Sequence, residues 1–457
     1  MNAKPVIGVW GHYADANLGD DACHTALLHH LKRLVPTARF VLFCRFPEIA
    51  QARWGWPAHP VHRLRRGQTG PWEPPPAVAG DGVVTALDRW RQRARQIGPL
   101  RRAVRALRAV LAGARAFPAE CRFLWQSYRR LRDVDVLVVT GSNPLFDFFG
   151  GFWRYPYTVW KWAALARLTR TRLAFVSVGA GPIVSARSGR LLARVLQRAD
   201  YVSFRDEGSR RLMRQYGFDG PSAVYPDLAH SLPFHPPPAR RAPTERLRVG
   251  INPMIVYHSV FWPVRDPAVQ QRYIKSLAHL AAALVAEGHD IFFYGTQKDD
   301  RVTAEEVQAA IRGATPSHLT PAFVMPASVD ELLELCAGAD LLVTTRFHGA
   351  VFGVITARPT LAICYQAKTR EVLEGAGLEA HTIGFEEVCP ERLRAAFDRL
   401  RAERNTVEAG LPRHAIDLRG RLDRQYHQVA ALLRREPRHD WPFSSQSREP
   451  DVAGTLS

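Results

Sequence analysis

Two cationic side chains that could bind an anion and move a proton stand two residues apart in the second half of the chain. Arg346 and His348 follow the apolar run 341–343, which is typical of a buried parallel strand. An arginine presents a planar cation that suits a carboxylate or a phosphate, and a histidine can donate a proton near neutral pH. Lys368 follows the next apolar run, 360–365, and would add a third cationic group at the same edge.

The position of these three residues predicts a ligand site. In an open α/β sheet, ligands bind in the crevice beyond the carboxyl ends of the strands. A single Arg or His at a strand end could equally lie in solvent. Three cationic groups after two neighbouring strands favour a site for an anionic substrate instead.

The first half of the chain offers further candidates after its own predicted strands. Arg205 follows the apolar run 201–204, although it could simply form a salt bridge to the adjacent Asp206. Gly141 follows the predicted strand 135–140, where a small residue lets a ligand approach the backbone closely.

The loop after the first predicted strand carries polar side chains of another kind. Asn17 and Asp20 precede a predicted helix at about 22–34. A strand, a loop and a helix in this order suit an anion at the helix N-terminus. However, Asp20 and Asp21 would repel an anion, and the loop lacks the glycine patterns of nucleotide-binding loops. Asn17 and Asp20 could instead bind sugar hydroxyls.

The alternation of strands and helices indicates two α/β domains. Residues 1–232 are predicted to form an N-terminal Rossmann-like domain and residues 247–435 a C-terminal one. The Pro-rich segment 233–246 is the predicted linker. After the last strand we expect one helix near 390–405 and a separate one near 418–434.

Two segments do not fit this alternation. Residues 51–132 form a predicted insertion in the N-terminal domain, in which 51–82 is rich in Pro, Gly and Trp and is expected to be irregular. Residues 83–132 have a helical pattern with one apolar face and Arg on the others. Such a basic helix can lie on an anionic membrane, or it can pack on its own domain with a solvated Arg face. The polar tail 436–457 is expected to be disordered.

The charge of the chain points to an acidic partner. The formal net charge is +19, and residues 91–132 alone hold twelve Arg against one Glu. A phosphorylated substrate, an anionic lipid surface or a nucleic acid would each fit this excess. The Arg-rich segment has few interleaved aromatic residues and no recognisable nucleic-acid-binding module, so we expect no nucleic acid.

Cysteine spacing and hydropathy bear on disulfides, metal sites and the location of the protein in the cell. The six cysteines show no paired spacing, so we predict no disulfide framework, no metal site and no cofactor. The chain opens directly on a predicted strand without a signal peptide, and no apolar run approaches the roughly 20 residues that cross a bilayer. We therefore expect a cytoplasmic protein, which the segment 83–132 could hold against the inner face of the membrane.

Several motifs, in their order and spacing, resemble those of the polysaccharide pyruvyl transferase family. They extend from about Gly11 to Leu378 and comprise NLGDDA, the glycine at 141, VSVGAGPI, YVSFRDEGS, PDLAH, DLLVTTRFHGAVFGV and RPTLAICYQAKT. The resemblance implies two Rossmann-like domains that face a cleft, as in GT-B-like glycosyltransferases. Many members have two or three consecutive glycines where this chain has Thr-Gly-Ser-Asn at 140–143, and the basic insertion has no counterpart in the resemblance.

The resemblance also implies an activity and a set of site residues. Family members transfer a pyruvyl group from phosphoenolpyruvate, a co-substrate, to sugar hydroxyls of a cell-surface glycan or its lipid-linked precursor, and form a pyruvate ketal. By matching motif, Arg205, Arg346 and His348 would form the phosphoenolpyruvate site. We hypothesise that the two arginines hold the donor and that His348 is the general acid/base. Lys368 would assist donor binding. The residues expected on the acceptor side are Asn17, Asp20, Gly141 and Asp227, of which Asp20 or Asp227 would orient or deprotonate a hydroxyl.

Two other functions are compatible with parts of the sequence. A glycosyltransferase of the same architecture would use a nucleotide-sugar, whose diphosphate a cationic cleft would bind equally well. A nucleic-acid-binding protein would account for the net charge of +19 but not for the residues at the strand ends.

Overall fold

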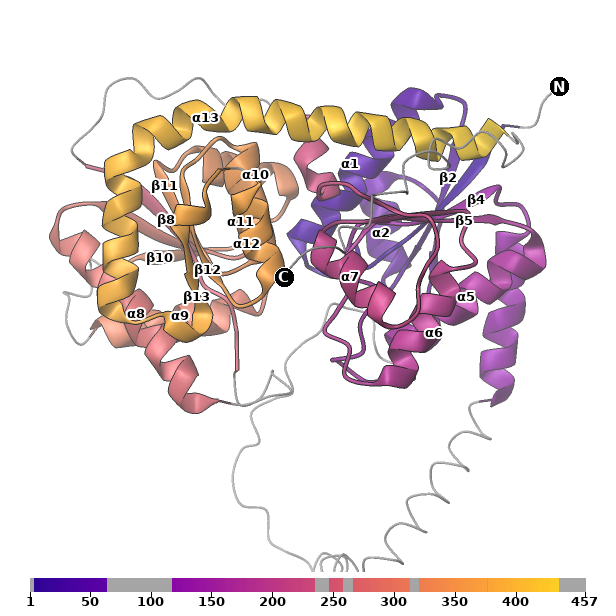
Figure 1. The fold of residues 1–457 in the computed structure, drawn as a ribbon, viewed down its shortest axis with the longest axis horizontal. Helices are drawn as coiled ribbons and strands as arrows, with labels where there is room; N and C mark the ends of the chain where they lie inside the picture. The colour runs from indigo at the N-terminus through magenta and orange to yellow at the C-terminus, as the bar shows by residue number, and fades with distance from the viewer. Residues whose placement is uncertain are drawn as a thin grey trace, which may run out of the picture.

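Two parallel β-sheets, each covered by helices, lie side by side (Figure 1). The structure, a computed structural model, describes residues 4–63, 117–234, 246–257, 266–312, 320–375 and 377–434. The expected α/β class with two Rossmann-like, GT-B-like domains is confirmed. The insertion expected within the N-terminal domain falls mostly on residues 64–116, which lie outside the described residues, as do most of the linker and the tail 436–457.

The N-terminal sheet has seven strands in the order β3-β2-β1-β4-β5-β6-β7. Its strands are β1 (Val6–Trp10), β2 (Arg39–Cys44), β3 (Ala58–Pro60), β4 (Val136–Val139), β5 (Arg172–Val178), β6 (Tyr201–Phe204) and β7 (Ala223–Val224). The helices of this domain are α1 (Leu18–Leu34), α2 (Pro47–Trp54), α5 (Tyr155–Thr169), α6 (Ala186–Leu196), α7 (Glu207–Gln215) and the short 3₁₀ helix η1 (Leu228–Ser231).

The C-terminal sheet has six strands in the order β10-β9-β8-β11-β12-β13. Its strands are β8 (Arg248–Asn252), β9 (Asp290–Tyr294), β10 (Ala322–Val324), β11 (Leu341–Thr344), β12 (Thr360–Cys364) and β13 (Thr382–Gly384). Its helices are α8 (Pro267–Ala286), α9 (Asp300–Arg312), α10 (Val329–Ala337), α11 (Phe347–Ile355), α12 (Ala367–Glu374) and α13 (Pro390–Ala431).

The strand order explains where ligands can bind. In both sheets the order reverses beside the first strand, between β1 and β4 and between β8 and β11. Loops diverge at such a switch point and leave a crevice beyond the carboxyl ends of the strands. The central strands are buried on both faces, as the run Val136–Val139 shows, because helices cover both sides of a parallel sheet.

The start of the expected insertion is part of the sheet instead. We expected residues 51–82 to be irregular, but α2 ends within this segment and β3 pairs with β2 in parallel register. Three residues are enough for this edge strand, too short a run for its apolar pattern to be visible in the sequence. Residues 117–131, at the other end of the segment, form a helix.

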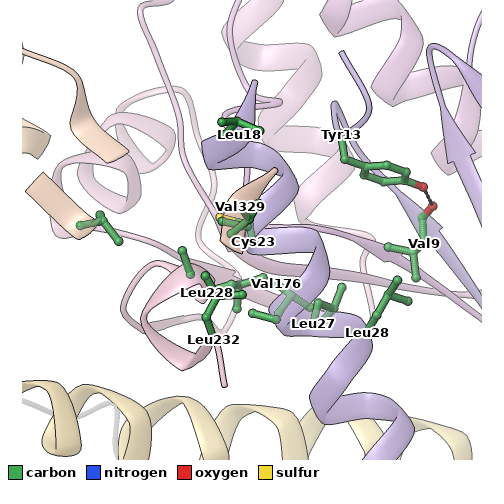
Figure 2. Close-up of a cluster of buried hydrophobic side chains, with 14 of the residues drawn as sticks. Val9, Tyr13, Leu18, Cys23, Leu27, Leu28, Val176, Leu228, Leu232 and Val329 are labelled. Carbon is green, nitrogen blue, oxygen red and sulfur yellow. Dashed lines mark hydrogen bonds between the residues drawn. The ribbon is translucent and has the colours of Figure 1, made fainter. Parts of the chain in front are cut away.

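The two domains share one apolar core. Leu18, Cys23 and Leu27 of α1 belong to the same buried cluster as Leu228 of η1 and Val329 of the C-terminal domain (Figure 2). Shared burial of this kind opposes separation of the domains because it would expose apolar surface.

Helix α13 connects the domains a second time. We expected two helices, but α13 is continuous over 42 residues despite Pro412 within it. Its first turns bury Phe397 in the C-terminal core, and its last turns bury Leu422 and Tyr426 in the cluster shared with the N-terminal domain. Figure 1 shows α13 extending across both domains. Helix α13 therefore begins on the C-terminal domain and ends on the N-terminal domain.

We predict that Leu422→Ala destabilises the protein by about 2–5 kcal/mol, because it opens a cavity where α13 packs on the N-terminal domain. Urea unfolding followed by circular dichroism would measure the loss. Ile416→Ala is the matched control on the same helix, since Ile416 is 68% exposed, and should stay within about 0.5 kcal/mol of wild type. Equal effects of the two substitutions would contradict the packing described for α13.

Candidate active site

A cleft of about 880 Å³ opens between the two domains at the carboxyl ends of their strands. Its walls include Asn17, Asp20 and Arg205 from the N-terminal domain. The facing wall holds the remaining donor-side candidates, which are Arg346, His348 and Lys368. Six of the eight residues proposed from the sequence therefore line one cleft, although they come from both ends of the chain.

The turn from β11 into α11 positions Arg346 and His348. Arg346 is the N-cap residue of α11, and His348 lies in the first turn of that helix. Gly349 lets the helix pack directly on the strand, because a Cβ atom there would lie 1.9 Å from Thr344 Oγ1. The short sequence between strand and helix thus directs both side chains into the cleft.

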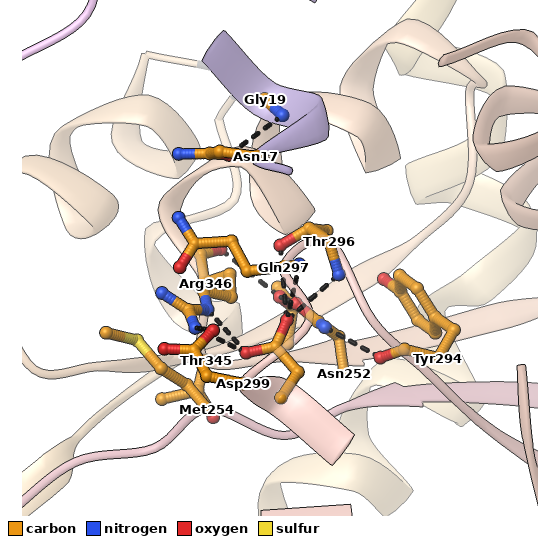
Figure 3. A network of polar contacts seen from close by, with 12 residues as sticks. Asn17, Gly19, Asn252, Met254, Tyr294, Thr296, Gln297, Asp299, Thr345 and Arg346 are labelled. Carbon is orange, nitrogen blue, oxygen red and sulfur yellow. Dashed lines mark hydrogen bonds and ion pairs between the residues drawn. The ribbon is translucent and has the colours of Figure 1, made fainter. Parts of the chain in front are cut away.

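Two carboxylates hold Arg346 in place. Its Nε donates to Asp300 Oδ1 at 2.7 Å, and its Nη2 donates to Asp299 Oδ1 at 3.0 Å (Figure 3). Burial alone would lower the pKa of Arg346, but the charges of Asp300 and Asp299 outweigh burial and raise that pKa above the usual value of an arginine. Arg346 is therefore a permanent, oriented cation at the edge of the cleft.

His348 lies on a buried polar cluster. Its Nε2 is 3.7 Å from Asp227 Oδ2 and 3.8 Å from Cys23 Sγ. Its Nδ1 lies close to α1, because a Cβ atom on Gly19 would come within 2.0 Å of it. Only glycine at position 19 leaves room for this imidazole, so the NLGDDA motif and His348 depend on each other.

Asp227 is the buried anion of the site. It accepts hydrogen bonds from Cys23 Sγ at 3.0 Å and Arg205 Nη1 at 3.3 Å, and it caps η1 through the amide of Ala229. Burial would raise the pKa of Asp227, but its interaction with His348 and the charge of Arg205 outweigh burial and hold that pKa well below its usual range. Asp227 is thus charged at any physiological pH.

Arg205 is buried on the N-terminal side of the cluster. Its guanidinium lies 4.2 Å from the centroid of the Phe347 ring and packs on Gly179, where a Cβ atom would be 2.4 Å from Nη2. Burial would lower the pKa of Arg205, but Asp227 and Asp206 outweigh burial and raise it. The salt bridge to Asp206 that the sequence left open is present, with Nε and Oδ2 3.6 Å apart.

Burial moves the pKa values of two groups of the cleft, Lys368 and Asp20, toward neutral pH. Burial, reinforced by the charge of Arg205, lowers the pKa of Lys368 to about 7. Burial raises the pKa of Asp20 to about 6, against the opposing charge of His348. Asn17 Nδ2 donates to Asp20 Oδ2 at 2.7 Å and so holds this carboxyl group toward the cleft.

Two of the candidates lie outside the lining of the cleft. Gly141 packs against Leu228, to which a Cβ atom would come within 2.9 Å. Asp227 is 2% exposed and lies beneath His348 and Arg205. We expected both on the acceptor side. The structure gives Gly141 a packing contact and makes Asp227 the partner of the cationic residues.

Three side chains of the cluster also form a donor set that a metal ion could use. Ligand atoms of Cys23, Asp227 and His348 lie within 4.8 Å of one another. Sulfur, oxygen and nitrogen donors suit zinc. However, Arg205 already binds Asp227, and burial together with the charge of Asp227 raises the pKa of the Cys23 thiol well above its usual value. The thiol is therefore neutral, and the neighbouring guanidinium opposes a second cation at this point.

Several residues of the site escaped the sequence analysis. Asp299 precedes α9 and Asp300 is its first residue, a position where acidic residues are common, so neither gave a signal of a role. Cys23 stood among scattered cysteines. Aromatic side chains also line the N-terminal wall, and these are Phe146, Phe148, Phe149 and Tyr155. The dense aromatic run after Asn143 was the one signal that could have indicated them.

The fold and the cleft together define a two-domain α/β protein of the GT-B class. Solved structures with this fold include UDP-GlcNAc 2-epimerase from Neisseria meningitidis, bound to UDP-GlcNAc, with a TM-score of 0.52 and 9% identity over 94% of this chain and 100% of the other. Alr3699/HepE from Anabaena, in complex with UDP, has a TM-score of 0.53 and 10% identity over 93% and 98%. MnaA from S. aureus, with UDP, has a TM-score of 0.53 and 10% identity over 95% and 99%. At these identities the likeness concerns the fold alone.

The family follows from the sequence itself. The model of the family described as polysaccharide pyruvyl transferase matches residues 17–366, which include most residues that line the cleft on both sides, although not Lys368. The chain belongs to the polysaccharide pyruvyl transferase family.

No helix in the described parts of the chain is both long and apolar enough to cross a membrane.

We predict that the cleft binds a dianion more weakly as pH rises from 6 to 8. With its pKa lowered to about 7, Lys368 is mostly protonated below that pH and mostly neutral above it, so its attraction is lost as pH increases. Sulfate is a suitable probe because its own charge is constant over this range. A charged hydrogen bond contributes about 1.5–3 kcal/mol, and a group with a pKa of about 7 changes its protonated fraction about tenfold over this range, so the dissociation constant should rise about five- to tenfold.

Isothermal titration of three proteins would separate the causes. Lys368→Arg keeps a cation at all pH values and should flatten the profile. Asp20→Asn should remove the smaller loss of sulfate affinity that occurs as the Asp20 carboxyl group ionises near pH 6. An unchanged profile in Lys368→Arg would show that Lys368 is not the titrating group.

Proposed function

We propose that this protein transfers a pyruvyl group from phosphoenolpyruvate to two hydroxyls of a sugar in a cell-surface glycan or its lipid-linked precursor, and so forms a pyruvate ketal. The observation that supports the proposal is the convergence of Arg205 from one domain with His348 and Lys368 from the other, in a chain of the polysaccharide pyruvyl transferase family. A cleft closed by cations from both sides suits a small donor with two anionic groups.

The charges of the donor fit the cations of the cleft. Phosphoenolpyruvate carries a carboxylate and a phosphate, which charged nitrogen donors bind strongly. Arg205 and Lys368 lie at 4.2 and 5.8 Å from the centroid of the Phe347 ring, so this ring keeps two cations close to one wall. Arg346 supplies a third cation whose orientation Asp299 and Asp300 maintain.

The proposed reaction requires proton transfer at a carbon atom. A proton is added to the methylene carbon, and the first sugar hydroxyl attacks the former enol carbon and loses its own proton. The bond to the phosphate oxygen then breaks, and the second hydroxyl forms the second C–O bond of the ketal as its proton leaves. Of the two hydroxyl protons, one replaces the proton delivered to carbon and the other is released with phosphate. In this scheme His348 delivers the proton to carbon and recovers one from a hydroxyl.

The buried anion beneath His348 has a supporting role in this scheme. The Oδ2 atom of Asp227 lies 3.7 Å from Nε2 of the imidazole. Because it does not line the cleft, it orients His348 rather than contacting an acceptor hydroxyl. Asp20 lines the cleft and has a pKa raised to about 6, so it can accept a hydroxyl proton near neutral pH.

A second candidate function is glycosyl transfer from a nucleotide-sugar. The solved structures from Anabaena and S. aureus contain UDP in the same fold. The same cationic wall would bind a diphosphate, so the two functions are best separated by direct comparison of donors.

We predict that phosphoenolpyruvate stabilises the purified protein and that UDP- and GDP-sugars do not. At 100 times its dissociation constant, a ligand of the native state alone adds about 2.7 kcal/mol, which appears as a clear rise in Tm. Lys368→Met should need at least about tenfold more phosphoenolpyruvate for the same rise. Lys275→Met, an exposed lysine of α8, is the control and should behave as wild type.

Arginine variants are less informative in this experiment. Arg346→Ala would leave Asp300 buried and unpaired, at a cost to folding of about 3–5 kcal/mol. A Tm rise that occurs only with a nucleotide-sugar would favour the second candidate function over the first.

We also predict that the space beside Gly19 is required for turnover. The methyl group that Gly19→Ala introduces would displace the His348 ring. Phosphate release from phosphoenolpyruvate with a panel of nitrophenyl hexosides should therefore fall at least about tenfold, because acid–base catalysis typically contributes more than that. His348→Gln should abolish release while keeping the Tm rise with phosphoenolpyruvate. Gly420→Ala is the control, because a Cβ atom there has no neighbour within 4 Å. Normal turnover in Gly19→Ala would refute this placement of His348.

A further inference from the structure

An exposed apolar stripe runs along α5, on the outside of the N-terminal domain. Trp153 just before the helix is 76% exposed, Trp160 is 42% exposed and Leu168 is 69% exposed. Tyr157 joins the two tryptophans, with ring centroids 5.7 Å from Trp153 and 5.9 Å from Trp160. Residues three or four apart share one face of a helix, so these side chains form a continuous surface. Soluble proteins rarely leave such a surface without a partner.

A row of arginines lies beside this stripe. Helix α6 packs next to α5, and it exposes Arg187, Arg190 and Arg194, which are spaced so that they share one face. Figure 1 shows α5 and α6 together below the N-terminal sheet. Arg167 and Arg170 are exposed at the end of α5 itself. We call the surface formed by Trp153, Trp160, Leu168 and these arginines the α5–α6 face.

A second helix extends the same surface. Lys161 of α5 forms an ion pair with Glu120 at 3.0 Å and lies over the ring of Phe123, so the helix of residues 117–131 packs beside α5. This helix also exposes Phe117, at 68%, and Trp125, at 61%. Aromatic residues and arginines are therefore mixed over three adjacent helices.

The segment that contains α5 and α6 carries charge of one sign. Between Asp147 and Asp200 the chain has nine Lys and Arg and no Asp or Glu. A protein partner of ordinary composition would leave many of these cations unpaired, whereas an anionic lipid surface would not. Tryptophan and tyrosine favour the boundary between lipid head groups and acyl chains, where one end of the ring is apolar and the other wet.

We propose that the α5–α6 face docks on an anionic lipid bilayer, with Trp153, Trp160 and Leu168 inserted at the head-group level and the arginines of α6 on the lipid phosphates. The sequence suggested such a contact for residues 83–132, whereas in this proposal α5 and α6 form the contact and residues 117–131 only extend it. An apolar stripe flanked by arginines, with no acidic residue, is the composition of helices that lie in the plane of a membrane surface.

Docking in this orientation brings the bilayer to the cleft. Arg154 and Tyr155, at the start of α5, line the cleft, as do Phe148 and Phe149 immediately before the stripe. A lipid-linked sugar could then enter the cleft without leaving the membrane. This last step depends on the proposed pyruvyl transfer, whereas binding to the bilayer does not.

Co-sedimentation with vesicles tests the docking. Wild-type protein should pellet with vesicles of phosphatidylcholine and phosphatidylglycerol, and remain in the supernatant with phosphatidylcholine alone. The double variant Trp153→Ser/Trp160→Ser and the triple variant Arg187→Gln/Arg190→Gln/Arg194→Gln should each lower the partition coefficient at least about tenfold, given about 1 kcal/mol per Arg near an anionic surface.

Matched variants on α13 serve as controls. Ile416→Ser removes an equally exposed apolar side chain, and Arg399→Gln/Arg413→Gln/Arg424→Gln removes the same charge from exposed positions elsewhere. Both should pellet as wild type does. If these controls lose binding to the same degree, or if wild type does not pellet with anionic vesicles, the proposal is wrong.

Two further measurements separate the remaining outcomes. Sedimentation velocity would reveal self-association through the face, and a dimer that the tryptophan variant dissociates, without any vesicle binding, would overturn the proposal. Phosphate release with soluble hexosides should be normal in the face variants, since none of these residues lines the cleft. Vesicle binding and pyruvyl transfer can therefore fail independently.

Discussion

A single buried carboxylate, that of Asp227, holds the two walls of the cleft together. It binds Arg205 and Cys23 from the N-terminal domain and lies 3.7 Å from His348 of the C-terminal domain. An isolated charge in this position would be very unfavourable, and the ion pair with Arg205 makes it tolerable. Removing Arg205 would leave Asp227 without this partner, so the cation of the cleft and the stability of the fold are coupled at this point.

The packing of the domains places these groups within reach of each other. The apolar cluster shared by α1, η1 and α10 lies directly behind the polar residues, and Cys23 belongs to both. Helix α13 adds a second connection, in which Gln425 forms hydrogen bonds with Ser177 of β5 and Ser203 of β6. Because these contacts bury the interface, the relative position of Arg205 and His348 is set by the core rather than by the side chains themselves.

The cations of the site differ in how strongly they are held. Arg346 and Arg205 are each paired with carboxylates, which fixes their direction in advance of any ligand. Lys368 has a pKa lowered to about 7, so its charge depends on pH and on what enters the cleft. The arginines of the α5–α6 face belong to neither group, since they are exposed and lie outside the lining of the cleft. The net charge of +19 thus serves at least two separate surfaces.

Much of the molecule is determined by the sequence alone. The short apolar runs before Arg205 and Arg346 specify buried parallel strands, and that position at a strand end already places both side chains at the crevice of the sheet. Gly19 and Gly349 belong to the sequence motifs that identify the family. What the sequence could not give was the set of contacts between distant segments. Asp227, Cys23 and His348 are separated by more than a hundred residues from one another, and only the docking of the two domains decides that the aspartate lies beside the histidine and outside the lining of the cleft. The sequence did not predict the continuity of α13 either, because its second half is stabilised by burial of Leu422 and Tyr426 against the other domain. Local pattern records which face of a segment is apolar, whereas the partner that buries that face is a property of the folded chain.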